Sequence, residues 1–267
     1  MSEDNIWIDS HAHLTMFDRD EVPEILARAA ENGVAGVLTP ATGGEDLDEA
    51  VALTRDHPDR IVAAAGIHPH EAATLDAGLK RRIERACAED GVVAVGEIGL
   101  DYHYMNSPQE DQIAALAWQL DLALEVGLSV VLHNRESWSD LEPMLDERRG
   151  RLRGVCHSFT EGPDEARRVI ALGLYVGISG MVTFKAADNI REMVAAVDPE
   201  RLLVETDSPF LAPVPHRGRR NEPSYVPLVG QRLAEEMKEP VGEIASITTT
   251  GFRELFGVGE DWPGSAG

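Results

Sequence analysis

The chain has 267 residues, of which 43% are hydrophobic and 27% charged, and its 47 acidic residues outnumber its 24 Lys and Arg residues to give a formal net charge of -23. This composition is typical of a folded protein and excludes a disordered chain, while the negative charge disfavours an extended surface for polyanions. The longest apolar stretch, residues 113–132, contains Gln119, Asp121 and Glu125 and is therefore a poor membrane span. Because α/β barrels of this length commonly form one domain, we expect residues 1–267 to be a single domain.

The beginning of the chain is acidic and leads directly into an apolar run. It has neither the basic region nor the apolar segment of a signal peptide. Cys87 and Cys156 are the only cysteines, too few for a disulfide framework, and we expect both to be small core residues. These features predict a cytoplasmic protein. A surface so acidic would suit a salt-rich cytoplasm, where charge repulsion is screened, although an ordinary acidic protein is the alternative.

Short apolar runs, rich in β-branched residues, alternate with amphipathic stretches along the chain. In chain order, the runs that predict strands are residues 6–8, 34–38, 61–65, 92–95, 128–132, 153–156, 174–178 and 202–204. Helical spacing is clear between the fourth and fifth runs, where Ile113, Leu116, Leu120 and Leu124 recur at three- and four-residue steps. Eight strands that alternate with helices predict a closed (β/α)8 TIM barrel, with an open doubly wound sheet as the alternative. We expect residues 261–267 to form a frayed tail.

Several predicted strands end in side chains that bind metals. The six candidates come from five strands, and they are His11, His13, Glu97, His133, His157 and Asp207. Alternation along the strands places His11 on the same face as Trp7, and Glu97 on the same face as Val95. Each acidic residue alone could be a helix cap or a loop charge. Because the carboxyl ends of barrel strands meet at one rim, we expect the whole set to converge there.

These ligands exceed what one tetrahedral catalytic metal requires and suit two divalent ions that share a carboxylate. Glu97 is the candidate bridge because its strand lies between the two groups. The expected groups are His11, His13 and Asp207 on one ion, and His133 and His157 on the other. The ions are expected to be Mg, Mn or Zn. Such a centre attracts a phosphate even in an acidic protein and turns a water into a nucleophile.

The motifs around these residues resemble the successive signatures of the TatD family of metal-dependent hydrolases. They are residues 10–14 (SHAHL), 66–70 (GIHPH), 96–102 (GEIGLDY), 133–135 (HNR), 156–159 (CHSF), 205–211 (ETDSPFL) and 217–223 (RGRRNEP). The resemblance implies a TIM barrel with a dinuclear centre that hydrolyses phosphodiester bonds, typically a DNase with exonuclease activity, and metal ligation by the six residues above. The chain departs from the family pattern at Ser129, where Pro is frequent, and at Gly251, where Asn is common. Both departures lie away from the metal ligands and therefore concern local packing.

Other polar residues are candidates for binding the substrate. His68 follows the third predicted strand and could contact a phosphate or act as a proton donor, and Arg135 lies two residues beyond His133, where its guanidinium could hold a phosphate oxygen. Arg217 belongs to a basic cluster, with Arg219 and Arg220, after the last strand. A loop histidine and solvated surface arginines are the alternatives. We give His70 and His103 less weight.

Three acidic residues near the proposed ligands have weaker signals. Asp9 and Glu205 could orient imidazoles as hydrogen-bond acceptors. Among the proposed ligands themselves, Asp207 could also take a proton from the attacking water. Asp101 could simply shape its loop.

The leading hypothesis is a two-metal nuclease that acts on the ends of DNA, and also of RNA, in the 3'-5' direction, with Asp207, Glu97 and His68 as catalytic residues. With 5% aromatic residues and no basic stripe, contact is expected to be confined to terminal nucleotides. The alternative is an amidohydrolase-like enzyme or deaminase for small molecules, because Glu136 stands three residues after His133 as in some single-metal deaminases. A binding protein without turnover is the third possibility. We expect a monomer that does not bind membranes.

Overall fold

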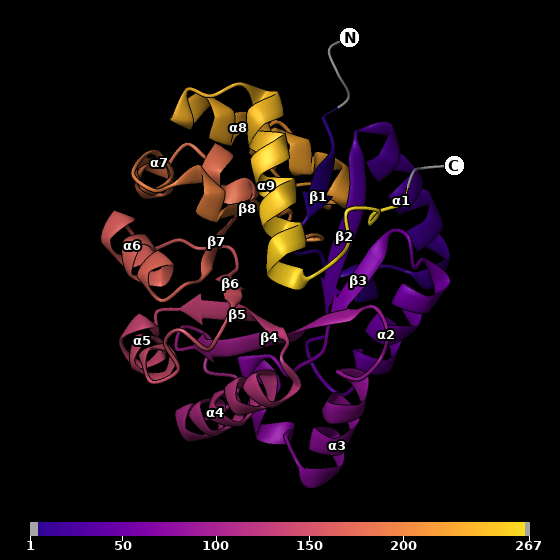
Figure 1. Ribbon diagram of the computed structural model, residues 1–267, viewed down its shortest axis with the longest axis vertical. Helices are drawn as coiled ribbons and strands as arrows, with labels where there is room; N and C mark the ends of the chain where they lie inside the picture. Colours follow the sequence, from indigo (N-terminus) through magenta and orange to yellow (C-terminus); the bar gives the residue numbers. More distant parts are fainter. Residues whose placement is uncertain (1–4, 265–267) are drawn as a thin grey trace.

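The computed structural model describes residues 5–264, in which eight parallel strands follow one another in chain order around a barrel (Figure 1). The strands are β1 (Trp7–Asp9), β2 (Val34–Pro40), β3 (Ile61–Ala64), β4 (Val92–Asp101), β5 (Ser129–Arg135), β6 (Gly154–Cys156), β7 (Tyr175–Ile178) and β8 (Leu202–Val204). Between β8 and β1 the barrel closes through backbone hydrogen bonds, such as that from Ser10 N to the Val204 carbonyl at 3.0 Å. The predicted TIM barrel is confirmed, and each expected run forms a strand.

Helices alternate with the strands and surround the barrel. They are α1 (Val22–Glu31), α2 (Leu47–Asp56), α3 (Ala77–Ala86), α4 (Gln109–Val126), α5 (Trp138–Asp146), α6 (Pro163–Ala171), α7 (Asp188–Ala195), α8 (Val226–Met237) and α9 (Val241–Phe256). Short 3-10 helices lie in the loops: η1 (Leu14–Met16), η2 (Arg19–Glu21), η3 (Pro69–Thr74), η4 (Gly180–Thr183), η5 (Pro199–Arg201) and η6 (Pro223–Tyr225). In residues 5–264, each helix is too short or too polar to cross a membrane.

The apolar core has two layers. The inner layer fills the barrel with side chains from every strand, namely Ile8, Leu38, Val62, Ala64, Ala94, Val131, Val155, Tyr175 and Leu203. The larger outer layer lies between the strands and the surrounding helices and includes Trp7 and Val95. Cys87 and Cys156 are both buried and unpaired, as expected.

Helix α9 closes the end of the barrel at which the strands begin, and it crosses the barrel in the view of Figure 1. Its side chains Phe252 and Phe256 join the inner layer. The Ser129 hydroxyl, at the start of β5, donates a hydrogen bond of 2.6 Å to the carbonyl of Leu255 near the helix end. At Gly251 a Cβ would lie 3.0 Å from the Tyr175 ring, so the glycine lets this ring pack inside the barrel. Both departures from the family pattern are therefore part of this closed end.

The described part of the C-terminal segment is packed against the barrel, and the expectation of a frayed tail is wrong for residues 261–264. The Trp262 ring stacks on Phe252 with centroids 5.7 Å apart. Its indole N–H donates to the carbonyl of Pro58 at 3.1 Å, while Arg253 donates to the Trp262 carbonyl at 2.9 Å. A single large aromatic side chain thus holds a segment whose composition suggests no regular structure. Residues 265–267 lie outside the described part.

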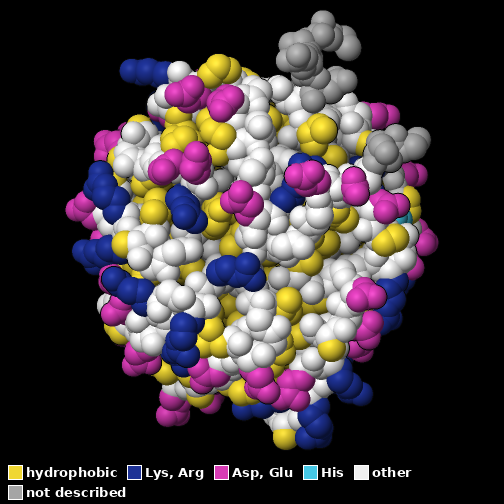
Figure 2. Space-filling model, viewed as in Figure 1, with side chains coloured by type: hydrophobic (Ala, Val, Ile, Leu, Met, Phe, Trp, Pro, Cys, Tyr) yellow, Lys and Arg dark blue, Asp and Glu magenta, His cyan; other side chains and the backbone are white. Residues whose placement is uncertain are grey.

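Charges of both signs are mixed on the face that α9 crosses. In Figure 2, acidic and basic side chains are interspersed over this face, and histidine is almost absent from it. The negative charge therefore forms no separate patch on this side. Most of the histidines lie at the opposite end of the barrel, where the strands end.

We predict that Ser129→Ala lowers the free energy of unfolding by about 1–3 kcal/mol, because the buried carbonyl of Leu255 loses its hydrogen-bond donor. Urea unfolding followed by circular dichroism measures this. The exposed Ser246 on the same helix provides the control, and Ser246→Ala should leave stability nearly unchanged. Equal stability of the two variants would contradict the proposed role of Ser129.

Candidate metal centre

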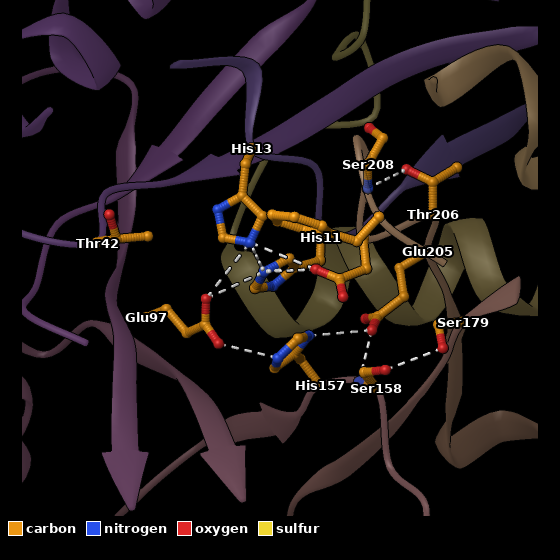
Figure 3. A network of polar contacts seen from close by, with 12 residues as sticks. His11, His13, Thr42, Glu97, His157, Ser158, Ser179, Glu205, Thr206 and Ser208 are labelled. Carbon is orange, nitrogen blue, oxygen red and sulfur yellow. Dashed lines mark hydrogen bonds and ion pairs between the residues drawn. The ribbon is translucent and has the colours of Figure 1, made fainter. Parts of the chain in front are cut away.

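The six predicted ligands meet at the carboxyl ends of the strands, around the buried carboxylate of Glu97. Figure 3 shows His11, His13 and His157 directed toward this carboxylate. The two oxygens of Glu97 face different imidazoles. Oε2 lies 3.3 Å from His11 Nε2 and 3.7 Å from His13 Nε2, whereas Oε1 lies 2.9 Å from His157 Nε2 and 3.0 Å from His133 Nδ1. Glu97 therefore stands between two groups of imidazoles and touches both.

The first group is completed by Asp207. Its Oδ1 lies 3.3 Å from His13 Nε2 and 3.8 Å from His11 Nε2. Asp207 has a left-handed backbone with φ of 57°, and its N–H donates to the His11 carbonyl at 2.8 Å. The loop after β8 is thus fastened to the segment after β1, which brings residues distant in sequence together.

The second group contains His68 in addition to His133 and His157. His68 Nε2 lies 3.5 Å from Glu97 Oε1. The ring of His157 also stacks on the ring of His11, with centroids 3.9 Å apart, so the two groups are in direct contact. His68, Glu97 and His133 form one of the sets of potential ligand atoms that lie within 4.8 Å of one another.

His11 was expected on the same strand face as Trp7, and Glu97 on the same face as Val95. Both expectations are wrong, although His11 and Glu97 do reach the centre. Val95 belongs to the outer layer of the core, while Glu97 faces the imidazoles, because the pairing of β4 with β5 shifts register between Val95 and Ile98. Gly96 permits this close packing, since a Cβ there would lie 2.7 Å from the side chain of Val131. An extra residue in a strand reverses the alternation beyond it.

At β1, His11 and Trp7 lie on different faces for another reason. Trp7 packs outward against Gly230 of α8, where a Cβ would lie 2.1 Å from the indole ring. The strand ends at Asp9, so alternation does not continue to His11. The carboxylate of Asp9 accepts hydrogen bonds from the backbone N–H of His11 and from the N–H and hydroxyl of Thr206. Asp9 therefore fixes the backbone rather than an imidazole ring.

Two carboxylates outside the centre orient its imidazoles. Glu205 accepts from His157 Nδ1 at 3.2 Å, as expected. Asp101 does more than shape its loop: Oδ1 accepts the backbone N–H groups of His103 and Tyr104, and Oδ2 lies 3.2 Å from His133 Nε2 and 2.9 Å from His70 Nε2. With Nε2 of His133 directed at Asp101, its Nδ1 faces Glu97. Second partners of this kind fix the tautomer and ring orientation of metal-binding histidines.

The charges of the centre shift several pKa values. Burial favours the neutral form of Glu97, but attraction to His157, His68 and His11 outweighs it and holds the pKa of Glu97 well below its usual value. Burial likewise opposes protonation of His157, yet Glu97 and Glu205 raise its pKa well above normal. Burial dominates at His68, whose pKa falls to about 4, and at Asp9, whose pKa rises to about 8. The centre therefore holds a buried anion that is neutralised by nearby imidazoles.

The arginines predicted to bind substrate lie in different surroundings. The Arg135 guanidinium stacks over the ring of Tyr104, 4.7 Å from its centroid. Arg217 stacks over Phe184 at 3.8 Å. Arg220 forms an ion pair of 2.8 Å with Glu21, so its charge is paired with an acidic side chain of this protein. Sequence reasoning did not single out Tyr104 or Phe210, two exposed aromatic residues in the loops after β4 and β8.

The donor set fits divalent metal ions. His11 Nδ1, His13 Nδ1 and Glu97 Oε2 are buried without a hydrogen-bond partner among the described residues. Buried polar atoms in proteins are almost always paired, so the unpaired Glu97 Oε2, which faces Nε2 of His11 and Nε2 of His13, indicates a missing partner at this place. His11, His13 and Glu97 form a second set of ligand atoms within 4.8 Å of one another, and His11, His157 and Asp207 form a third. Imidazole and carboxylate donors at such spacing are those of Zn, Mn and Mg sites.

Comparisons with known proteins agree with this geometry. A family model described as "TatD related DNase" matches residues 8–257. The metal-dependent hydrolase YabD of Bacillus subtilis is 37% identical over 93% of this chain and 98% of its own length. The 3'-5' ssDNA/RNA exonuclease TatD of Erwinia tasmaniensis is 36% identical over 90% of this chain and 93% of its own.

A solved structure shows the same fold. The crystal structure of YJJV, a TatD homologue from Escherichia coli, superposes with a TM-score of 0.90 at 31% identity, covering 96% of this chain and 100% of that one. The match to the family model, the identities and the superposition each extend over nearly the whole chain. The chain therefore belongs to the TatD family of metal-dependent hydrolases.

Proposed function

We propose that this hydrolase is a two-metal phosphodiesterase that removes nucleotides from the 3' ends of single-stranded DNA and RNA, acting as a monomer in the cytoplasm. The position of Glu97 carries the proposal. A carboxylate whose two oxygens face two separate groups of imidazoles is suited to bridge two ions. A single catalytic ion would need only three protein ligands.

The chain divides the proposed ligands between two sites. His11, His13 and Asp207 would hold one ion, His133 and His157 the other, and Glu97 both. When bound, two divalent ions supply an activated water and positive charge opposite a phosphate. Nitrogen-rich ligation suits Zn or Mn, whereas phosphodiester chemistry is also compatible with Mg.

We assign the proton acceptor to Asp207. Its side chain is 13% exposed, compared with 2% for Glu97, so it lies nearer to the surface that substrate and water reach. Attraction and hydrogen bonding by the histidines overcome the effect of burial and lower its pKa. Asp207 is therefore ionised near neutral pH and able to receive a proton.

Of the two roles expected for His68, contact with a substrate phosphate is the better supported. The backbone N–H of His70 donates to His68 Nδ1 at 3.2 Å, which leaves the ring proton on Nε2, the atom that faces the centre. With a pKa lowered to about 4 by burial, this imidazole is neutral near neutral pH. We assign it to donating a hydrogen bond to a substrate phosphate rather than to delivering a proton or binding metal.

Arg135 and Arg217 are the proposed phosphate contacts outside the centre. Among residues 5–264, neither guanidinium has a carboxylate within 4 Å, so both are available to an anionic substrate. The name of the Erwinia relative supports the 3'-5' direction and action on both DNA and RNA. The deaminase alternative depended on Glu136, which stands three residues after His133. Glu136 does not support it, because its side chain is exposed and lies 2.8 Å from His103 Nδ1.

We predict that Glu97→Gln lowers kcat on single-stranded DNA by about 100-fold or more, because it weakens the charge that holds both ions. Strands labelled at either end, with Mg, Mn and Zn compared at low and high salt, give the rate and the direction of cleavage. Glu136→Gln, an exposed acid nearby, is the matched control and should retain activity. If the wild-type protein cleaved no strand with any of these metals, the nuclease proposal would be contradicted. Full activity of the wild-type protein with a single bound ion would contradict the two-metal proposal.

We also predict that metal binding near neutral pH releases protons and strengthens as pH rises. The raised pKa of His157 means that its imidazole carries a proton in the metal-free protein, which must leave before the nitrogen binds an ion. Affinity should therefore rise until the pH exceeds that pKa. Titration calorimetry in buffers of different ionisation enthalpy measures the protons released, and binding without release would disprove this assignment.

A further inference from the structure

Exposed apolar side chains gather at the metal end of the barrel. Of the large hydrophobic side chains that are exposed in residues 5–264, those in loops after β1, β4 and β8 are Met16, Tyr104, Met105, Phe210 and Val214. The two others, Ile6 and Val126, lie near the closed end. Single exposed apolar residues are ordinary, whereas a concentration around one site indicates an interaction surface.

Of the two aromatic members, Phe210 lies against the first group of the centre, and Tyr104 lies against His70, which is next to His68 of the second group. The Tyr104 ring meets His70 edge-on, with centroids 5.5 Å apart. Phe210 meets His13 edge-on at 6.1 Å. β4 and β8 are four strands apart in an eight-stranded barrel and lie on opposite sides of it (Figure 1). The loops that follow them therefore leave the barrel on opposite sides of its mouth. Glu97 lies between these two sides.

Both aromatic residues are anchored to the proposed catalytic machinery. The N–H of Tyr104 donates to Asp101 at 2.8 Å, and Asp101 also holds His133. The N–H of Phe210 donates to the carbonyl of Asp207 at 2.9 Å. Their backbones are thus fixed relative to the centre, while the two residues are 54% and 51% exposed. An aromatic ring held in this way loses little entropy when a flat ligand stacks on it.

We propose that Tyr104 and Phe210 are stacking platforms for the bases on the two sides of the scissile phosphate, at the 3' end of the bound strand. The inference rests on the proposed nuclease function and specifies how the substrate is recognised. Stacking accepts any base, which suits an enzyme that shortens strands without regard to sequence. Arg135, stacked on Tyr104, supplies a positive charge beside the first platform. A protein partner fits less well, since the two rings stand apart with a polar centre between them.

The test compares strands that differ only in their terminal bases. One single-stranded DNA carries normal bases, and the other carries abasic residues at its last two 3' positions. Tyr104→Leu and Phe210→Leu keep an apolar side chain but remove the ring, and Val126→Ala at the closed end is the control. We expect each Leu variant to raise KM for the normal strand about fivefold or more, the loss typical of one stacked base, with KM for the abasic strand unchanged.

A binding measurement separates this proposal from the nuclease function. A strand with 2-aminopurine at its 3' end and non-hydrolysable terminal linkages, added to the metal-loaded wild-type protein, should lose fluorescence on binding, and the Leu substitutions should remove that quenching. If the wild-type enzyme cleaves normal and abasic strands with equal KM, the platforms are disproved while the nuclease function stands. If no strand is cleaved but the ring-dependent quenching is present, the nuclease function fails and base binding stands.

Discussion

The arrangement of the whole site depends on one buried carboxylate. An unpaired charge inside a protein is very costly, and Glu97 is tolerated because His11, His133 and His157 surround it within 3.3 Å. The imidazoles in turn are oriented from outside by Glu205 and Asp101. If one member is removed, the remaining buried groups lose a partner, which is energetically unfavourable. The centre therefore behaves as a unit.

The barrel separates this centre from the part of the molecule that provides stability. At the closed end, α9 inserts aromatic side chains into the inner core, and Trp262 stacks on one of them. At the open end the chain places charged, polar and exposed aromatic side chains on loops. Such a division lets the strands fix the positions of catalytic groups while the loops vary, which is the general property of TIM barrels.

The sequence alone predicts the strands, the barrel and the convergence of the six polar residues, because hydrophobic alternation and the positions of strand ends are local properties. It does not predict how Glu97 comes to face the centre. The register shift beside Val95 depends on packing between β4 and β5, which no single-strand pattern reveals. The sequence also does not predict the anchoring of Trp262 or the contact of Asp101 with His133. Each of these contacts joins segments far apart in the chain.

If the protein is the nuclease that we propose, its net charge of -23 constrains how it recognises a strand. Long-range electrostatic attraction to phosphates is absent, so a strand that approaches gains favourable energy only near the mouth of the barrel. Contacts that act at short range must then supply the affinity: unpaired guanidiniums such as Arg135, and aromatic rings that stack without charge. Salt screens the repulsion between the strand and the acidic surface more than it weakens stacking. For the nuclease function that we propose, such a surface favours contact with the end of a strand, the mode of an exonuclease, over tracking along a duplex.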